Sequence, residues 1–461
     1  MVLKLLDPDS VAVVGASPKP GTVGYIILEN LATRFRGEVY PVNPKYDVVE
    51  LWGRKIKFYK SIADVEKIVD VVVIATPAPT VPRILEEAGA KGVKAAIIIS
   101  SGFAEAGNVE LEHTVGDIAK RYGIRVLGPN CIGVYNAFSN FDTIFLPIDR
   151  AGRSPPGPLA LISQSGAVAV AIMDWAARRK LGLGYLVNYG NKVDVDEVEI
   201  LEAFAKDDRI KVITVYLEGF KYPGEARRFL KTAKRIAPAK PIVAYKAGRG
   251  KAAQRAVKSH TAAMSGTYEM YRGLFKQAGI IEASSVREMF DMAKALATQP
   301  IPRGNRVLIV TDSGGMGIQA VDVLEALGLE VPEIPESIGR ELRKELLPFA
   351  AVSNPIDVTG SATDEHYKIV IDALLPTPFF DMALVVTLLQ VPGLTKNLAE
   401  HIIDAKRYGK PLAVVNFGGS DLVIKFEELL EDNDIPVYPT PDRAAKALWA
   451  LYRYSQVKKG L

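Results

Sequence analysis

The sequence predicts an α/β protein made of three consecutive doubly wound parallel sheets. Short apolar runs alternate with amphipathic segments of helical period along the chain, which is the pattern of parallel strands connected by helices. The apolar runs are continuous, as in strands that are covered on both faces. Near Gly15, Ser163 and Asp312, an apolar run ends in a small, glycine-containing turn that opens a helix. The same structural unit is therefore predicted three times.

Length and composition are consistent with this fold class. A chain of 461 residues has room for about three domains, and 48% hydrophobic with 24% charged residues is typical of a globular protein. The net charge of +4, with both signs mixed, predicts no nucleic-acid partner. Cys131 is the single cysteine, which excludes an internal disulfide and a cysteine-rich metal site, and no metal site is expected. The chain lacks a long apolar run and a signal-peptide pattern, so we expect a cytoplasmic protein without a membrane span.

The first domain is predicted over residues 1–130. Its first strand runs into a turn that begins at Gly15 and reaches a helix near Gly24. Glycines permit close backbone approach, and a helix N-terminus offers free N–H groups, so the turn suits a phosphate. Five residues separate Gly15 from Gly21, unlike the dinucleotide turn, and Lys45 stands where an NAD site has an acidic residue. A tight turn without a ligand is the alternative. We expect strands at 10–15, 39–43, 71–76, 95–100 and 125–128, with helices at 24–33, 81–90 and 110–122.

Ligands of such sheets bind at the C-terminal ends of the strands. Here all of those ends are small or polar, so a long phosphorylated ligand fits across them. The candidate ligand-binding residues are Gly15, Ala16, Ser17, Gly21, Gly24, Asn43, Lys45, Thr76, Pro77, Ser100, Gly102 and Asn130.

The second domain is predicted over residues 131–298. A strand at 158–163 ends in Ser163-Gln164-Ser165-Gly166 and opens a helix that ends near residue 179. Hydroxyl and backbone N–H groups at a helix start can bind an anion, although a plain serine N-cap explains the same residues.

Glu218 and His260 are the candidate catalytic pair of this domain. Glu218 ends an apolar strand, and a solvated loop glutamate is its alternative. A strand at 239–246 feeds a glycine-rich, basic stretch at 245–254, which predicts a mobile surface loop ahead of His260. Lys246, Arg249 and Lys251 in this stretch could compensate charge, and a solvated loop is their alternative. A carboxylate that fixes the tautomer of a histidine leaves the other ring nitrogen as a nucleophile. A histidine without chemistry is the alternative.

The third domain is predicted over residues 299–461. A strand at 306–311 leads into the Asp312 turn and a helix, with further strands at 383–388 and 412–417. Asp312 and Asp357 are turn-forming residues or ligand contacts, and the sequence does not separate these possibilities. Helices are expected at 397–408, 421–432 and 441–456.

Five motifs in one order resemble a known family. They are the Gly15 loop, Gly128-Pro-Asn-Cys-Ile-Gly133, Ser163-Gln-Ser-Gly166, Glu218-Gly219 and Ser259-His260-Thr261. Over essentially the whole chain, this sequence resembles the alpha subunit of succinyl-CoA synthetase and, more closely, that of the NDP-forming (ADP-forming) acetate–CoA ligases of archaea. The resemblance implies a Rossmann-like CoA-binding domain followed by two flavodoxin-like domains.

The resemblance also implies roles for the site residues. His260 would carry a phosphoryl group, and Glu218 would orient it. The turn Ser163, Gln164, Ser165 and Gly166 would bind phosphate. Gly15, Ser17, Gly21, Gly24 and Lys45 match positions that contact coenzyme A.

The implied reaction converts acyl-CoA, ADP and phosphate to an organic acid, ATP and CoA. The sequence has no P-loop and no stretch left for a nucleotide-grasp domain, so ADP/ATP and Mg²⁺ are expected on a beta subunit in an α2β2 heterotetramer. The alternatives are a CoA-binding regulatory module without catalysis, a ligase for branched or aromatic acyl groups, a nicotinamide dehydrogenase and a fused protein acetyltransferase. The glycine spacing disfavours the dehydrogenase, and the absence of a fourth domain disfavours the acetyltransferase.

Overall fold

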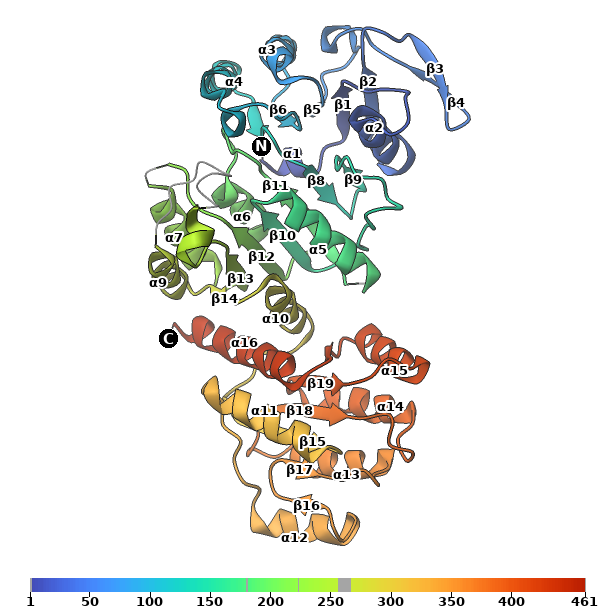
Figure 1. The fold of residues 1–461 in the computed structure, drawn as a ribbon, viewed down its shortest axis with the longest axis vertical. Coiled ribbons are helices and arrows are strands. Elements are labelled where there is room, and N and C mark those ends of the chain that lie inside the picture. The colour runs from blue at the N-terminus through green and yellow to red at the C-terminus, as the bar shows by residue number, and fades with distance from the viewer. Residues whose placement is uncertain (1, 180, 223, 256–266, 461) are drawn as a thin grey trace. The chain divides into compact units, whose positions relative to one another are not determined.

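The computed structural model describes residues 2–179, 181–222, 224–255 and 267–460. His260 lies outside these residues. Two compact units are present, Met1–Ile236 with Ala244–Glu282, and Ala237–Val243 with Ala283–Leu461. In the described residues the strands form sheets of five, seven and six strands and a two-stranded hairpin (Figure 1). The predicted α/β class with mainly parallel sheets is confirmed, and the domain boundaries stay a prediction.

The first sheet is entirely parallel and has the order β2-β1-β5-β6-β7. Valine and isoleucine fill its buried strands, as expected for β-branched side chains on a covered sheet. Helices α3 and α4 each end at a glycine in the left-handed conformation. The elements are β1 (Ser10–Val14), α2 (Val23–Arg34), β2 (Glu38–Val42), β5 (Val71–Ile74), α3 (Val81–Lys91), β6 (Ala95–Ile98), α4 (Val109–Tyr122) and β7 (Arg125–Leu127).

A hairpin that the sequence analysis did not predict follows β2. Strands β3 (Val48–Leu51) and β4 (Arg54–Lys57) pair antiparallel. Trp52 and Gly53 join them, both with positive φ (51° and 72°), as in the primed two-residue turns of hairpins.

The second sheet has the order β14-β13-β12-β10-β11-β8-β9. Strand β10 pairs in parallel with β11 and β12, whereas β8 runs antiparallel to β11. The strands are β8 (Gly133–Asn136), β9 (Phe141–Asp142), β10 (Leu159–Ser163), β11 (Leu183–Asn188), β12 (Val212–Leu217), β13 (Ile242–Lys246) and β14 (Ile281–Glu282), and the helices include α5 (Gly166–Arg178), α6 (Glu197–Ala205), α7 (Glu225–Ile236) and α9 (Tyr268–Ala278).

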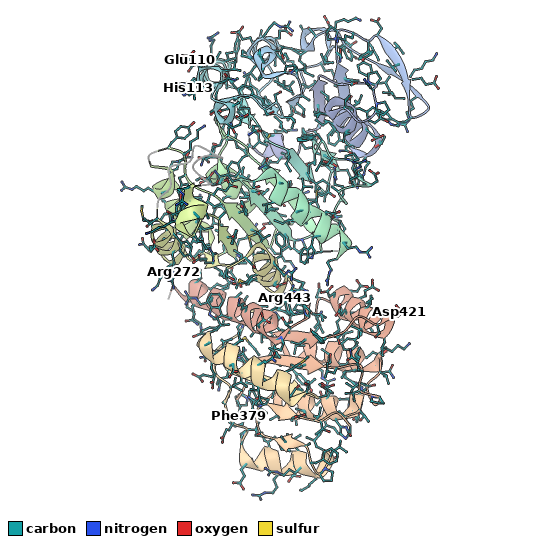
Figure 2. All side chains as sticks on the ribbon, in the orientation of Figure 1. Glu110, His113, Arg272, Phe379, Asp421 and Arg443 are labelled. Carbon is teal, nitrogen blue, oxygen red and sulfur yellow. The ribbon has the colours of Figure 1, made fainter. Side chains whose placement is uncertain are left out.

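The third sheet has the order β16-β17-β15-β18-β19-β20. Helices α10 and α16 pack together, and Arg443 donates two hydrogen bonds of 2.6 Å to Asp291 (Arg443 is labelled in Figure 2). The strands are β15 (Val307–Thr311), β16 (Ala351–Val352), β17 (Ile356–Asp357), β18 (Met382–Thr387), β19 (Leu412–Asn416) and β20 (Val437–Tyr438), and the helices are α10 (Val286–Thr298), α11 (Gly314–Ala326), α12 (Glu336–Glu345), α13 (Asp364–Leu374), α14 (Asn397–Asp404), α15 (Asp421–Asp432) and α16 (Pro441–Lys459).

The three sheets share one topology. In each, the first parallel strand is central, the second lies on one side of it and the third on the other, as in β2-β1-β5, β11-β10-β12 and β17-β15-β18. The chain reverses its direction of travel across the sheet at that first strand, and such a switch point is where open α/β sheets bind ligands. The predicted turns at Gly15, Ser163 and Asp312 each follow one of these strands.

Two expectations about the second domain overlap at Tyr245 and Lys246, a strand over 239–246 and a surface loop over 245–254. In the structure both residues end strand β13, and Lys246 is only 3% exposed. The strand prediction is therefore confirmed at these two residues, and the loop prediction is wrong there. The sheet continues past the point at which basic and glycine residues begin, because β13 is an inner strand of this sheet.

Within the part of the chain that the structure describes, no helix combines the length and the apolar character needed to cross a bilayer.

Candidate active site

A cavity of about 390 Å³ lies at the C-terminal edge of the first sheet. Five predicted residues line it, at the ends of β1, β2 and β5: Gly15, Asn43, Lys45, Thr76 and Pro77. The sequence analysis missed other lining residues, among them Lys60, Ser61, Thr80 and Arg83. None of these residues directly follows a strand of the sheet, so the expectation that ligands bind at the C-terminal ends of strands did not identify them. The cavity combines basic and hydroxyl side chains at a switch point, which suits a phosphorylated ligand.

The turn after β1 packs closely against its neighbours at two glycines, Gly15 and Gly24. Gly15 has φ +94°, and a Cβ atom there would lie 2.4 Å from the Ala75 carbonyl oxygen. At Gly24, a Cβ atom would lie 1.9 Å from the Gly15 carbonyl oxygen. Thr22 caps the helix by accepting from the Tyr25 N–H (3.3 Å). Glycine is therefore required at 15 and 24 by the close packing of strand, turn and helix.

Hydrogen bonds connect several of the other predicted residues at this edge. Asn43 donates to the Ala16 carbonyl (2.8 Å), and the Ser17 hydroxyl accepts from the Lys19 N–H (3.0 Å). The Ser100 hydroxyl donates to the Thr76 carbonyl (2.5 Å). The Asn130 N–H donates to the Ser100 carbonyl (2.9 Å). Ala16, Ser17, Gly21, Gly24, Ser100, Gly102 and Asn130 do not line the cavity, and their ligand contacts stay a prediction.

The turn after β10 is held by side chains from two neighbouring strands. The Ser165 hydroxyl caps α5 by accepting from the Val168 N–H (3.4 Å), and the Ser163 hydroxyl donates to the Ser165 carbonyl (2.7 Å). Asn188, which the sequence analysis missed, donates to the carbonyls of Ser163 (2.9 Å) and Gln164 (3.1 Å). A Cβ atom at Gly166 would lie 2.8 Å from the Ile132 side chain. The start of α5 is thus a rigid helix N-terminus, which favours an anion.

Glu218 is joined to this turn through Gln164. The Gln164 amide oxygen accepts from the main-chain N–H groups of Glu218 (2.7 Å) and Gly219 (3.0 Å). Its amide nitrogen donates to the Gly219 carbonyl (3.2 Å). Glu218 itself is 7% exposed, so the alternative of a solvated loop glutamate is wrong. The structure places the predicted carboxylate and the predicted phosphate turn side by side, and it gives the Gln164 side chain a positioning role.

Lys246 approaches the same segment from β13. Its ammonium donates to the Glu218 carbonyl (2.7 Å) and to the Ala247 carbonyl. Burial lowers the pKa of Lys246 to about 8; Glu218 acts in the opposite direction, and Arg249 adds to the lowering. The sequence analysis placed Lys246 where a predicted strand meets a predicted loop and named it as a residue that could compensate charge; its burial was not predicted.

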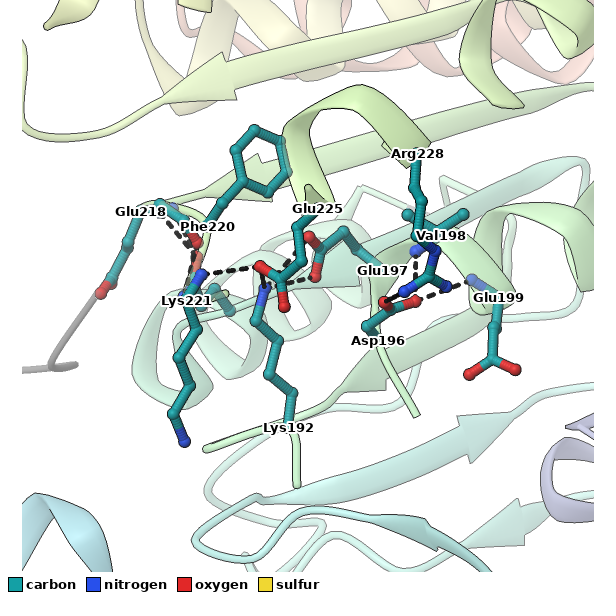
Figure 3. Close-up of polar contacts among 12 residues, drawn as sticks. Lys192, Asp196, Glu197, Val198, Glu199, Glu218, Phe220, Lys221, Glu225 and Arg228 are labelled. Atoms are coloured by element: carbon teal, nitrogen blue, oxygen red, sulfur yellow. Dashed lines mark hydrogen bonds and ion pairs between the residues drawn. The ribbon is translucent and has the colours of Figure 1, made fainter. Parts of the chain in front are cut away.

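A buried ion cluster lies beneath this edge (Figure 3). The Lys192 ammonium contacts the Glu197 carboxylate (3.1 Å to each oxygen) and the Glu225 carboxylate (2.8 Å), and the Lys221 N–H donates to Glu225 (2.6 Å). Burial raises the pKa of Glu197 to about 6, although Lys192 opposes the shift. The sequence analysis missed this cluster, because charged residues between apolar runs are also typical of exposed turns.

The Asp312 turn of the third domain holds a buried carboxylate. Asp312 is 5% exposed, and it accepts from the Leu388 N–H (2.9 Å). Burial raises the pKa of Asp312 to about 6. Asp357 accepts from the Thr359 N–H (2.8 Å), a contact typical of turn-forming aspartate. Whether either residue contacts a ligand stays open.

Family models match all three parts of the chain. A CoA binding domain matches residues 9–137, a succinyl-CoA ligase like flavodoxin domain matches 156–296, and a ligase-CoA domain matches 307–461. Together with the three switch points, these matches define a protein of the CoA-ligase class.

Individual relatives identify the family within that class. The chain is 41% identical to the alpha subunit of ADP-forming acetate–CoA ligase I of Pyrococcus furiosus, with 98% of each chain covered. It is also 41% identical to the ADP-forming acetate–CoA ligase of Methanocaldococcus jannaschii, a longer chain of which it spans 63%. The acetyl-coenzyme A synthetase 1 of Ca. Korarchaeum cryptofilum, solved in complex with phosphate and ADP, is 40% identical and superimposes with a TM-score of 0.91 over 100% of this chain and 98% of that one. The chain belongs to the family of ADP-forming acetate–CoA ligases, whose alpha subunits it matches over their length, and the resemblance inferred from the sequence is confirmed.

Proposed function

We propose that the chain is the alpha subunit of an ADP-forming acetyl-CoA synthetase, which converts acetyl-CoA, ADP and phosphate to acetate, ATP and CoA. The observation that carries this proposal is the link between Gln164 and the Glu218 segment (2.7 and 3.0 Å). It holds an anion-binding helix start beside a buried carboxylate, which is what transfer of a phosphoryl group to a histidine requires.

In this proposal the first domain binds the thioester substrate, acetyl-CoA. The cavity at the β1, β2 and β5 ends would hold the nucleotide portion of coenzyme A. Lys45 and Arg83, which line it, would contact phosphate groups, and Gly15 would let the backbone approach the ligand. The remaining predicted residues of this edge would complete the contacts.

The second domain performs three transfers in this proposal. A phosphate held at Ser163–Gly166 attacks the thioester carbonyl, the C–S bond breaks, and acetyl phosphate forms as the CoA thiol leaves. A ring nitrogen of His260 then attacks phosphorus, the bond to the acetate oxygen breaks, and acetate leaves. ADP finally takes the phosphoryl group from His260 and becomes ATP. Glu218 orients the imidazole and stabilises its positive charge while it carries the phosphoryl group.

A partner subunit completes the enzyme in this proposal. The Pyrococcus furiosus relative is named as an alpha subunit, and the Methanocaldococcus jannaschii relative extends beyond the matched region. A nucleotide-grasp beta subunit would bind ADP/ATP with Mg²⁺ and form an α2β2 heterotetramer. The proposed domains are 1–130 for coenzyme A, 131–298 for the phosphohistidine and 299–461 for assembly.

Radioactive labelling tests the proposal. The complex with the partner subunit is incubated with Mg²⁺ and [γ-³²P]ATP, and acid-labile, base-stable label on the chain is measured. Wild type and His113→Asn, a control at an exposed position of α4, should be labelled equally, whereas His260→Asn should carry none. Equal label in His260→Asn, or no label in a wild-type complex whose partner binds nucleotide, would support a CoA-binding regulatory module instead.

A further inference from the structure

Lys246 is a buried lysine at the edge that carries Glu218. It is the last residue of β13 and is 3% exposed. Its ammonium donates to the carbonyls of Glu218 and Ala247. It also lies 4.5 Å from the centroid of the Tyr271 ring, a cation–π distance. The side chain is therefore fixed in direction, and its contacts are main-chain oxygens and an aromatic face.

Lys246 has no ion pair among the described residues, whereas Lys192 is paired with two glutamates. The Glu218 carboxylate favours the charged form of Lys246, but burial outweighs it. The two lysines flank one aromatic stack, since Tyr271 stacks on Phe220 at 5.4 Å and Lys192 lies 5.7 Å from the Phe220 ring. Dipoles and rings compensate a buried ammonium less well than a negative charge does. A dianionic group that arrives at this edge would gain from that positive charge.

We propose that Lys246 is a positioning residue for phosphoryl transfer, which fixes the main chain of Glu218 and supplies the positive charge that stabilises the phosphorylated enzyme. This inference rests on the proposed function, because it assumes that a phosphoryl group is carried beside Glu218. Coupling between two sites is reciprocal. Protonation of Lys246 therefore favours phosphorylation, and phosphorylation favours the protonated lysine.

The charge state of Lys246 changes in an accessible pH range. Its pKa is lowered to about 8, so the ammonium is lost as pH rises through that value. The charged and titratable groups that act on it are Glu218, which follows β12, Arg249, which follows β13, and Tyr271 on α9. Burial raises the pKa of Tyr271, and arginine stays charged.

The test compares phosphoenzyme levels of the holoenzyme between pH 6.5 and 9.5, with [γ-³²P]ATP and Mg²⁺ as the probe. We expect Lys246→Met to lower the level about tenfold at pH 7, because the phosphorylated enzyme loses a charge-assisted stabilisation. The gap between Lys246→Met and wild type should close above pH 8, where wild type is also uncharged. The phosphoenzyme level of Lys246→Arg should stay constant at alkaline pH and exceed that of wild type there, because arginine stays charged. A gap that stays constant with pH would show a purely structural role and overturn the proposal.

Two further variants, a second uncharged substitution and a matched control, make the test independent of the folding of Lys246→Met. Lys246→Gln keeps a donor for the Glu218 carbonyl without the charge, so it should behave like Lys246→Met; a wild-type level and pH profile would overturn the role of the charge. If Lys246→Met does not fold, Lys246→Gln and Lys246→Arg are sufficient to test the proposal. Lys410 is a matched control, because its ammonium also donates to two carbonyls, those of Thr377 and Phe380 (2.6 Å each), and burial lowers its pKa. Lys410→Met should leave the profile unchanged.

The same data separate the two proposals. If wild type is not labelled, or if His260→Asn carries the same label as wild type, the proposed function fails. If wild type is labelled at His260 but all Lys246 variants follow its pH profile, only the role of Lys246 fails.

Discussion

Gln164 and Glu218 are joined although they lie 54 positions apart in the sequence. The Gln164 amide oxygen accepts from the Glu218 N–H at 2.7 Å and from the Gly219 N–H at 3.0 Å. Because Gln164 follows β10 and Glu218 follows β12, this contact fixes the phosphate turn relative to the carboxylate. The main-chain N–H of Gln164 is also used, since it donates to the Tyr216 carbonyl (3.1 Å). The side chain and the main chain of Gln164 thus both tie the phosphate turn to the end of β12.

Gln164→Leu should therefore damage both stability and phosphoryl transfer. The leucine leaves the N–H groups of Glu218 and Gly219 without their acceptor in a buried place, and each such group costs about 1–3 kcal/mol. We expect a lower thermal midpoint and at least a tenfold lower rate of His260 labelling. Differential scanning calorimetry and rapid-quench labelling measure the two effects. Gln277→Leu, at an exposed position of α9, is the control, and identical behaviour of the two variants would contradict the argument.

Gly24→Ala should weaken the binding of acetyl-CoA. The added Cβ would lie 1.9 Å from the Gly15 carbonyl oxygen, so the turn between β1 and α2 must open. Overpacking of this kind costs about 1–3 kcal/mol, and a widened turn no longer fits the ligand. Isothermal titration calorimetry with acetyl-CoA checks this. Gly53→Ala places a residue at φ +72° with no atom within 4 Å, so it should strain the backbone by about 1 kcal/mol and leave the affinity unchanged.

Local patterns were enough to predict the strand–turn–helix units. The buried strands β1, β10 and β15 are continuous apolar runs, and a glycine follows each within a few residues, so neighbours in sequence carried the signal. The ends of β1, β2 and β5 then met in one cavity, as the topology of parallel sheets implies.

The contacts between distant segments were not predictable in the same way. No local pattern indicates that Asn188 holds the Ser163 turn, because the contact depends on the order of β10 and β11 in the sheet. The burial of Lys246 was not predicted either, since it follows from the inner place of β13 in the sheet and not from the basic neighbours of Lys246. Strand β8 pairs antiparallel with both β11 and β9, and β8 and β9 are too short to show a period.

Lys45→Met should weaken the binding of coenzyme A more than the binding of 3′-dephospho-CoA. Lys45 lines the cavity after β2, and a basic side chain there suits the 3′-phosphate of coenzyme A. A hydrogen bond to a charged group contributes about 1.5–3 kcal/mol, so we expect about a tenfold loss for coenzyme A and little change for the dephosphorylated analogue. Calorimetric titrations at one fixed salt concentration measure both ligands. Lys55→Met, in the exposed hairpin strand β4, is the control. An equal loss for both ligands would show that Lys45 does not contact the 3′-phosphate.

Glu197→Gln should change how stability depends on pH. Burial raises the pKa of Glu197 from its ordinary 4.5 to about 6, so the folded state binds a proton more tightly than the unfolded state. The resulting stabilisation, about 2 kcal/mol, is complete below pH 4.5 and is lost as pH rises to about 6. Glutamine does not titrate, and it leaves Lys192 paired with Glu225 alone. Urea unfolding midpoints at pH 4.5 to 7 should therefore show Glu197→Gln gaining on wild type as pH rises.

The control for this prediction is Glu202→Gln on the same helix. Glu202 pairs with Arg235 at the surface, where its side chain is 41% exposed, and surface pairs contribute about 0–1 kcal/mol. Its unfolding midpoint should follow that of wild type at every pH. The comparison isolates the buried cluster, because both substitutions remove one carboxylate from α6 and only Glu197 is wholly enclosed. A constant difference between Glu197→Gln and wild type across the range would mean that Glu197 is ionised throughout, and that Lys192 alone overcomes the cost of burying its charge.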